Sequence, residues 1–284
     1  MDWMNAKTTR GLGLALGLAA GTLAYPMALA ASADESLDFT YDVVVSGLQA
    51  AEIKFNMDLT PTGYQSKASV ETQGIVSFFS DSQTFVGASG EIINGKAVPA
   101  AFSTRTEKSG KQKDFKVRWT ESGQPEPHDP PVKNPQMQAD IIEALTSGVI
   151  DPLTAVLRVR GEAPCEGKQR IYSGRDVFDL TFKLEREVTF GDKADGVYRG
   201  PAFQCQMVYH PIAGRDATKA RKNKTEPWAV TVWFAPVDSQ SLGSQMLLPV
   251  AAAGKLDGRK FRAFASRASV SGQALNQLSS VSTN

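Results

Sequence analysis

The chain has 284 residues, and hydrophobic residues make up 42% of them, which is enough for a substantial core. Its 31 basic and 30 acidic residues give a formal net charge of +1, which falls to about zero without residues 1–30 because that segment holds two basic residues and one acidic residue. This balance argues against a nucleic-acid partner and against bulk attraction to an anionic membrane.

Residues 1–30 have the features of a cleaved secretory signal peptide. Two basic residues precede an apolar run at residues 11–24, which is shorter than the about 20 residues that a membrane-spanning helix needs. A small-x-small cleavage site then ends at Ala30. We therefore expect a soluble, exported chain that begins near Ala31 and does not stay inserted in the membrane. An uncleaved N-terminal membrane anchor is the alternative.

From residue 38 onward, apolar residues alternate with polar ones, which is the period of strands with one buried face. The clearest segments are residues 38–45, 52–59, 115–119, 178–185, 203–209 and 228–234. Turn residues at 61–63 and at Asn94-Gly95 separate neighbouring segments. The alternation is weaker in the last segment, at 259–270. The pattern predicts a mainly β fold, a large antiparallel meander at residues 38–272 that forms a single domain.

The pattern changes in the middle of the chain. A proline-rich connector at residues 124–135 predicts stiff, extended backbone that cannot join a sheet. Two short helices are expected after it, within about residues 137–160, and the second begins with Asp151 as N-cap and Pro152 at the first helical position. The polar residues 273–284 predict a flexible tail.

The two cysteines have three possible roles: nucleophile, metal ligand or disulfide. In an exported protein, Cys165 and Cys205 are most simply disulfide partners. A cysteine nucleophile needs a nearby base, but His210 lies five positions after Cys205 in an extended segment and so points to the opposite face. His128 lies in the proline-rich connector, and two Cys with two scattered His make a weak zinc site. We predict a disulfide, with no catalytic residue, metal or cofactor; catalysis and metal binding stay open as weaker alternatives.

Two further stretches invite functional interpretations. Residues 90–97, "GEIINGKA", nearly match a phosphate-binding loop, but Ala97 replaces the hydroxyl that would hold magnesium, so a hairpin turn is the better interpretation. The second stretch, residues 214–227, is rich in basic residues and predicts a solvated hairpin loop. Alternatively, basic side chains of this loop contact a partner or an anionic surface, and the candidates are Lys219, Arg221, Lys222 and Lys224.

Several stretches resemble one family when they are taken together and in order. They are "YDVVVSGLQAAEIKF" (41–55), "GVIDPLTAVLRV" (148–159), "PCEGKQRIYSGRDVFDLTF" (164–182), "CQMVYHPIAG" (205–214) and "VTVWFAP" (230–236). They resemble the bacterial domain of unknown function 3108, found in exported proteins of Gram-negative bacteria, over about residues 40 to 270.

This resemblance has three implications. Both cysteines occupy motif positions, which supports the disulfide. The architecture is similar to the open, incompletely closed β-barrels of periplasmic lipoprotein carriers, so we expect an open barrel or curved sheet. No activity is attached to the family, and a shared fold does not decide function.

Two functions are compatible with these features. The first is a non-enzymatic periplasmic cell-envelope protein that acts as an interaction or scaffold module for an envelope partner. The alternative is a carrier or binder of a lipid-like or lipoprotein-derived apolar group in a concave groove of the sheet. The candidate groove residues are Phe55, Met57, Phe178, Phe182, Met207 and Trp228.

Overall fold

The computed structural model describes residues 34–73, 82–127, 131–191, 196–223, 227–256 and 258–276. The predicted signal peptide, His128, Lys224 and residues 277–284 of the predicted tail lie outside the described residues.

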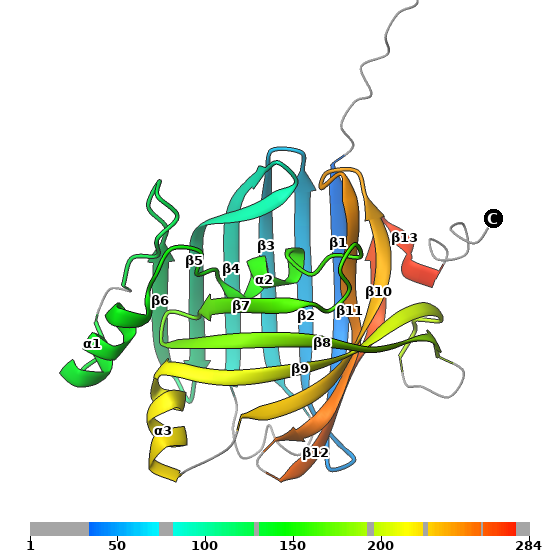
Figure 1. Ribbon diagram of the computed structural model, residues 1–284. Helices are drawn as coiled ribbons and strands as arrows, with labels where there is room; N and C mark the ends of the chain where they lie inside the picture. The colour runs from blue at the N-terminus through cyan, green and yellow to red at the C-terminus, as the bar shows by residue number, and fades with distance from the viewer. Residues whose placement is uncertain are drawn as a thin grey trace, which may run out of the picture. The chain divides into compact units, whose positions relative to one another are not determined.

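The described residues form one antiparallel sheet of 13 strands (Figure 1). The first six are β1 (Glu35–Val45), β2 (Leu48–Thr60), β3 (Gly63–Thr72), β4 (Ser82–Ile93), β5 (Lys96–Lys108) and β6 (Lys111–Arg118). The others are β7 (Gly167–Tyr172), β8 (Asp176–Phe190), β9 (Gly200–Gly214), β10 (Trp228–Ser239), β11 (Ser244–Leu256), β12 (Arg259–Val270) and β13 (Gln273–Ala274). The predicted mainly β fold is confirmed.

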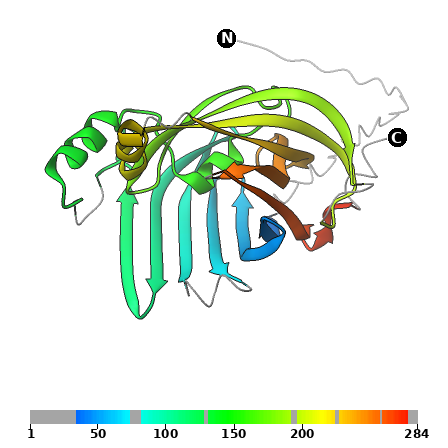
Figure 2. The same ribbon diagram turned by 90° about the horizontal axis from the view of Figure 1, so that it is seen from below.

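The sheet consists of two meanders joined by the pairing of β1 with β12. Its strand order is β6-β5-β4-β3-β2-β1-β12-β11-β10-β9-β8-β7, and β13 pairs with β12. Among the described strands, β6 and β7 do not pair with each other, so the curved sheet is not closed into a barrel. Figure 2 shows β8 and β9 arching over the concave side of the first meander.

Turn chemistry and strand pairing explain two features of the sheet. Asn94 and Gly95 both have positive φ, 52° and 72°, as a two-residue hairpin turn between β4 and β5 requires. β12 is a full strand although its alternation is weak, because it pairs with β1 on one side and β11 on the other. The β1–β12 register also shifts between Thr40 and Tyr41, and such a bulge interrupts the period of two.

Within the described residues, three short helices accompany the sheet: α1 (Pro135–Ala144), α2 (Pro152–Leu157) and α3 (Arg215–Asn223). The first two match the predicted helices. Asn134 caps α1 by accepting a hydrogen bond from the Met137 N–H at 3.0 Å. Asp151 caps α2, with Pro152 at its start.

The helix α3 corrects the prediction of a hairpin loop at residues 214–227. Nearly all its side chains are polar, so it shows no apolar stripe, and among residues 215–222 only Ala217 is buried. Its charges nevertheless suit a helix, because Asp216 lies in the first turn and Arg221 and Lys222 lie in the last.

The beginning of the predicted tail belongs to the folded domain. Residues 273–274 pair with β12, and Leu275 is buried. The Asn276 side chain accepts a hydrogen bond from the Arg199 N–H at 2.7 Å and donates one to the Val197 carbonyl at 2.6 Å. Residues 273–276 are therefore held in place.

The main hydrophobic core lies between the two meanders. It joins Leu37, Phe102, Ile141, Leu157 and Leu248, which come from β1, β5, α1, α2 and β11. A second cluster surrounds the two cysteines and involves β8 to β11. No described helix has both the length and the hydropathy to cross a membrane.

Candidate binding cavity

An apolar cavity of about 480 Å³ lies on the concave side of the first meander. It is lined by β1 to β5, α2, the β7–β8 turn, β11 and β12. The lining residues are Phe39, Tyr41, Ile53, Phe55, Ala68, Val70, Val86, Phe102, Thr104, Pro152, Leu153, Val156, Ser173, Leu248, Pro249, Ala251, Ala252 and Ala263. This size lies within the range of small-molecule sites.

The period of the strands explains how this cavity is built. On each strand alternate side chains point to the same face, so Phe39, Phe55 and Phe102 from three strands converge on the concave side. These three rings are buried, whereas Ile53 and Val70, which also line the cavity, are half-buried. The cavity thus has a buried part and a part that solvent reaches.

Helix α2 covers one side of the cavity with Leu153 and Val156. A buried polar chain fixes this helix to the sheet. Asp151 accepts hydrogen bonds from the Leu153 and Thr154 N–H groups at 2.9 and 2.8 Å, and the Thr154 hydroxyl contacts both the Asp151 carboxylate and the Tyr64 hydroxyl of β3. Burial raises the pKa of Asp151, although these hydrogen bonds oppose the rise.

The cavity lining contains no charged side chain. Its three hydroxyl groups belong to Tyr41, Thr104 and Ser173. The Tyr41 hydroxyl donates a hydrogen bond to the Pro249 carbonyl at 2.8 Å, and burial raises its pKa, so the phenol stays neutral. Ser173 bonds the backbone of Asp176 at 3.3 Å. This lining suits an apolar ligand and gives it few polar contacts inside the cavity.

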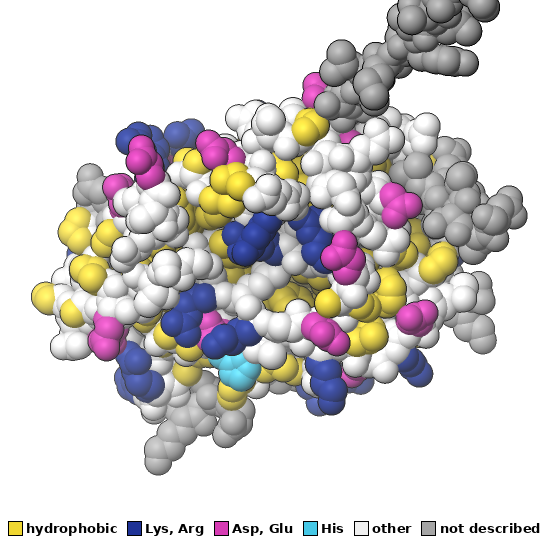
Figure 3. Space-filling view, turned by 45° about the horizontal axis from the view of Figure 1, so that its top comes forward, with side chains coloured by type: hydrophobic (Ala, Val, Ile, Leu, Met, Phe, Trp, Pro, Cys, Tyr) yellow, Lys and Arg dark blue, Asp and Glu magenta, His cyan; other side chains and the backbone are white. Residues whose placement is uncertain are grey.

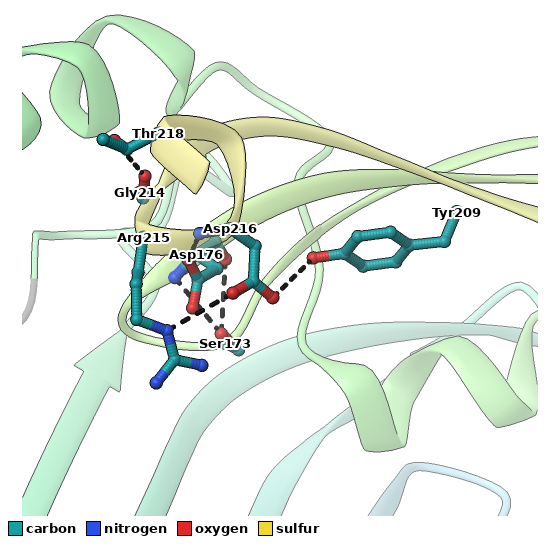
Figure 4. A network of polar contacts seen from close by, with 7 residues as sticks. All are labelled: Ser173, Asp176, Tyr209, Gly214, Arg215, Asp216 and Thr218. Atoms are coloured by element: carbon teal, nitrogen blue, oxygen red, sulfur yellow. Dashed lines mark hydrogen bonds and ion pairs between the residues drawn. The ribbon is translucent and has the colours of Figure 1, made fainter. Parts of the chain in front are cut away.

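A polar network lies beside the cavity, where α3 begins (Figure 4). Asp176 accepts a hydrogen bond from the Asp216 N–H at 2.9 Å, and the Tyr209 hydroxyl donates to the Asp216 carboxylate at 3.2 Å. Burial raises the pKa of both Asp176 and Tyr209. These contacts tie α3 to the β7–β8 turn. Within the described ranges, no group of three or more His, Cys, Asp or Glu residues could hold a metal ion.

The structure brings the two cysteines together. The sulfur atoms of Cys165 and Cys205 lie at disulfide distance, and their Cα atoms are 5.9 Å apart. Both residues are buried beside Phe182, Val232 and Leu247, which excludes water from the sulfur atoms. His210 pairs with Asp179 across β8 and β9, on the face opposite to Cys205.

The six candidate groove residues fall into separate places. Phe55 lines the cavity, and Met57, two residues further along β2, is buried in the main core without lining it. The other four belong to β8, β9 and β10 and pack in the smaller clusters: Phe178, Phe182, Met207 and Trp228. The remaining lining residues were missed, although several of them follow the same alternation as Phe55.

The basic residues of α3 are partly engaged within the chain. Lys219, Arg221 and Lys222 are all exposed, and Arg221 forms an ion pair with Asp140 of α1 at 2.9 Å. On the face that Figure 3 shows, Lys and Arg side chains are interspersed with Asp and Glu side chains. That face therefore presents mixed charge.

Comparisons with known proteins place the chain in a family. No curated protein matches it. Among solved structures, the β-barrel-like protein of domain of unknown function DUF1849 from Brucella abortus is similar with a TM-score of 0.44 and 9% sequence identity, covering 84% of this chain and 98% of that chain. Residues 40–252 match the family described as protein of unknown function (DUF3108). The chain therefore belongs to the DUF3108 family, as its motifs predict.

Proposed function

We propose that the protein is an envelope binding protein that holds an apolar, chain-like ligand in the cavity between β1–β5 and α2. The observation that carries this proposal is the cavity of about 480 Å³ whose lining has no charged side chain and is partly open to solvent. A fully packed interior would have favoured the hypothesis of an interaction or scaffold module. The cavity instead favours the hypothesis of a carrier or binder of a lipid-like group.

Burial of an alkyl chain supplies enough free energy for such binding. Each buried CH₂ group contributes about 0.8 kcal/mol, so a chain of about twelve carbons contributes about 10 kcal/mol if it is fully buried. The loss of translational freedom on association reduces this by at least about 4 kcal/mol. We therefore expect affinities in the micromolar range or weaker, which suit a protein that both takes up and releases its ligand.

We place the protein in the periplasm. The support is the signal-like segment at residues 1–30 and the pairing of Cys165 with Cys205, which suits an oxidising compartment. The interaction-module hypothesis has less support, because one of the three described candidate cations, Arg221, is paired with Asp140 although it is exposed, and Lys219 and Lys222 are the two without an ion pair to another described residue.

Native mass spectrometry of protein purified without detergent from its own host tests the proposal. We expect a bound apolar molecule that organic extraction removes. Ala68→Phe would place a ring in the cavity, whereas Ala229→Phe would place the same ring at an exposed position of β10. Loss of the bound molecule in Ala68→Phe alone supports the proposal. Equal retention in both variants, or a wild-type protein that binds no alkyl ligand in titrations, would contradict it.

A further inference from the structure

The β7–β8 turn, at residues 173–175, contributes to the cavity lining and carries one cation, Arg175. Ser173 of this turn lines the cavity, and Arg175 follows two residues later. The Arg175 guanidinium carbon lies 5.2 Å from the centre of the Phe115 ring on β6. Phe115 pairs directly with Thr104 of β5, which also lines the cavity. Arg175 does not itself line the cavity; its guanidinium lies against the strand partner of one lining residue, and the turn that carries it contributes another.

A glycine in a left-handed conformation shapes this turn, which lies in van der Waals reach of β6. Gly174 has a φ of +85°, and a Cβ at this position would lie 3.4 Å from the Phe115 Cβ and 3.5 Å from a Val117 methyl group. The Tyr172 hydroxyl also donates a hydrogen bond to the Gly174 carbonyl at 3.1 Å. These contacts hold Arg175 in place before any ligand arrives.

The Arg175 guanidinium keeps its N–H groups available. Its contact with Phe115 is to the face of the ring, and no described residue accepts a hydrogen bond from the guanidinium. No carboxylate of the described residues lies within ion-pairing distance of it. The adjacent Asp176 interacts electrostatically with Arg175, and its carboxylate accepts the Asp216 N–H at 2.9 Å; Asp216 pairs with Arg215 at 3.3 Å. By contrast, Arg170 of β7 is fully engaged with Asp179.

Hydroxyl groups of β5 lie next to the Phe115 ring that Arg175 contacts. The Thr104 hydroxyl makes no hydrogen bond to another described residue. Thr106, two residues further along β5, is on the same face as Thr104. It pairs with Thr84 of β4, and the two hydroxyl groups are hydrogen-bonded at 3.2 Å. Along β5, the face that lines the cavity is therefore apolar at Phe102 and carries hydroxyl groups at Thr104 and Thr106, on the side where Arg175 lies.

We propose that the ligand is a single-chain amphiphile with an anionic headgroup, either a carboxylate or a phosphate monoester. Its chain occupies the cavity, and its headgroup binds the Arg175 guanidinium and the Thr104 hydroxyl. The planar fork of arginine suits both headgroups, because two parallel N–H groups can bind two oxygens of one anion. This inference rests on the proposed function, since the cavity must first accept an alkyl chain.

Titrations with four probes of equal chain length test the inference: dodecanoate, dodecyl phosphate and dodecyltrimethylammonium below their micelle concentrations, and dodecanol below its solubility limit. We expect at least one of the two anions to bind about tenfold tighter than dodecanol, as a hydrogen bond to a charged group allows. The tighter of the two identifies the headgroup. Dodecyltrimethylammonium should bind more weakly than dodecanol.

Arg175→Gln separates recognition of the headgroup from support of the fold. It should remove the preference for the anion and leave the dodecanol affinity unchanged, and Arg267→Gln at an exposed position of β12 should change neither. Arg175→Lys keeps the charge without the fork and should retain part of the preference. Equal affinities of the wild type for dodecanoate, dodecyl phosphate and dodecanol would overturn the inference about the headgroup but not the proposed function. Equal losses for alcohol and anion in Arg175→Gln would do the same. Failure of all four probes to bind the wild type would also overturn the proposed function.

Discussion

Removal of the link between Cys165 and Cys205 should destabilise the protein by about 4 kcal/mol. The two residues are 40 positions apart, and closing a loop of this length removes about 13 cal/mol/K of entropy from the unfolded chain, or about 4 kcal/mol at 25 °C. Urea unfolding of wild type and Cys165→Ala/Cys205→Ala, followed by tryptophan fluorescence, measures the difference. Reduced wild type is the matched control, because it keeps both sulfur atoms in the core and loses only the link.

The local backbone supplies a second comparison. Cys165 has a φ of 57°, a left-handed conformation that disfavours alanine. Cys165→Gly/Cys205→Ala should therefore be more stable than the double alanine variant by about 1 kcal/mol. If the double alanine variant and reduced wild type both lost less than about 1 kcal/mol, the pairing of Cys165 with Cys205 would contribute little, and the reasoning would be refuted.

Three other substitutions test the sheet and the helix that covers the cavity. Thr154→Val removes the hydroxyl between Tyr64 and Asp151 and should lower the free energy of unfolding by about 2 kcal/mol; an unchanged urea midpoint would contradict this. The raised pKa of Asp151 means that the folded state holds its proton more tightly than the unfolded state, so this contribution to stability is full below about pH 4 and is lost as the pH rises. Asp151→Asn should remove this part of the pH dependence. If the urea midpoint of Asp151→Asn changed with pH in the same way as that of the wild type, this prediction would be wrong. Gly90→Ala would place a Cβ 2.1 Å from the Val98 carbonyl oxygen, so we expect a melting temperature lowered by several degrees, and an unaltered one would argue against this close approach of β4 and β5.

Most of the sheet could be predicted because period-two alternation is a local signal. In β2, Phe55, Met57 and Leu59 are buried between exposed neighbours, as the sequence pattern indicates. Helix α2 was also predictable, because Asp151 and Pro152 form a local start signal. Local signals failed for α3, whose anchoring depends on the contact between Asp216 and Asp176 of a distant strand.

The cavity could not be located from the sequence, because alternation shows which residues share a face but not which faces meet. Phe55 and Phe182 lie in equally clear patterns, yet the first lines the cavity and the second packs beside the cysteines. The difference depends on tertiary arrangement, because β2 and β8 belong to different meanders of the sheet. Arg175 stands out in the sequence only as part of a family motif, since its approach to Phe115 depends on the same tertiary arrangement.

The proposed function requires that an alkyl chain enters the cavity beneath α2. A crystal structure with dodecanoate that carries bromine on its terminal carbon tests this directly, because anomalous scattering locates the bromine. We predict a bromine peak among Phe55, Phe102 and Leu153, inside the cavity. A peak on the outer face of the sheet, or an empty cavity at saturating ligand, would contradict the account.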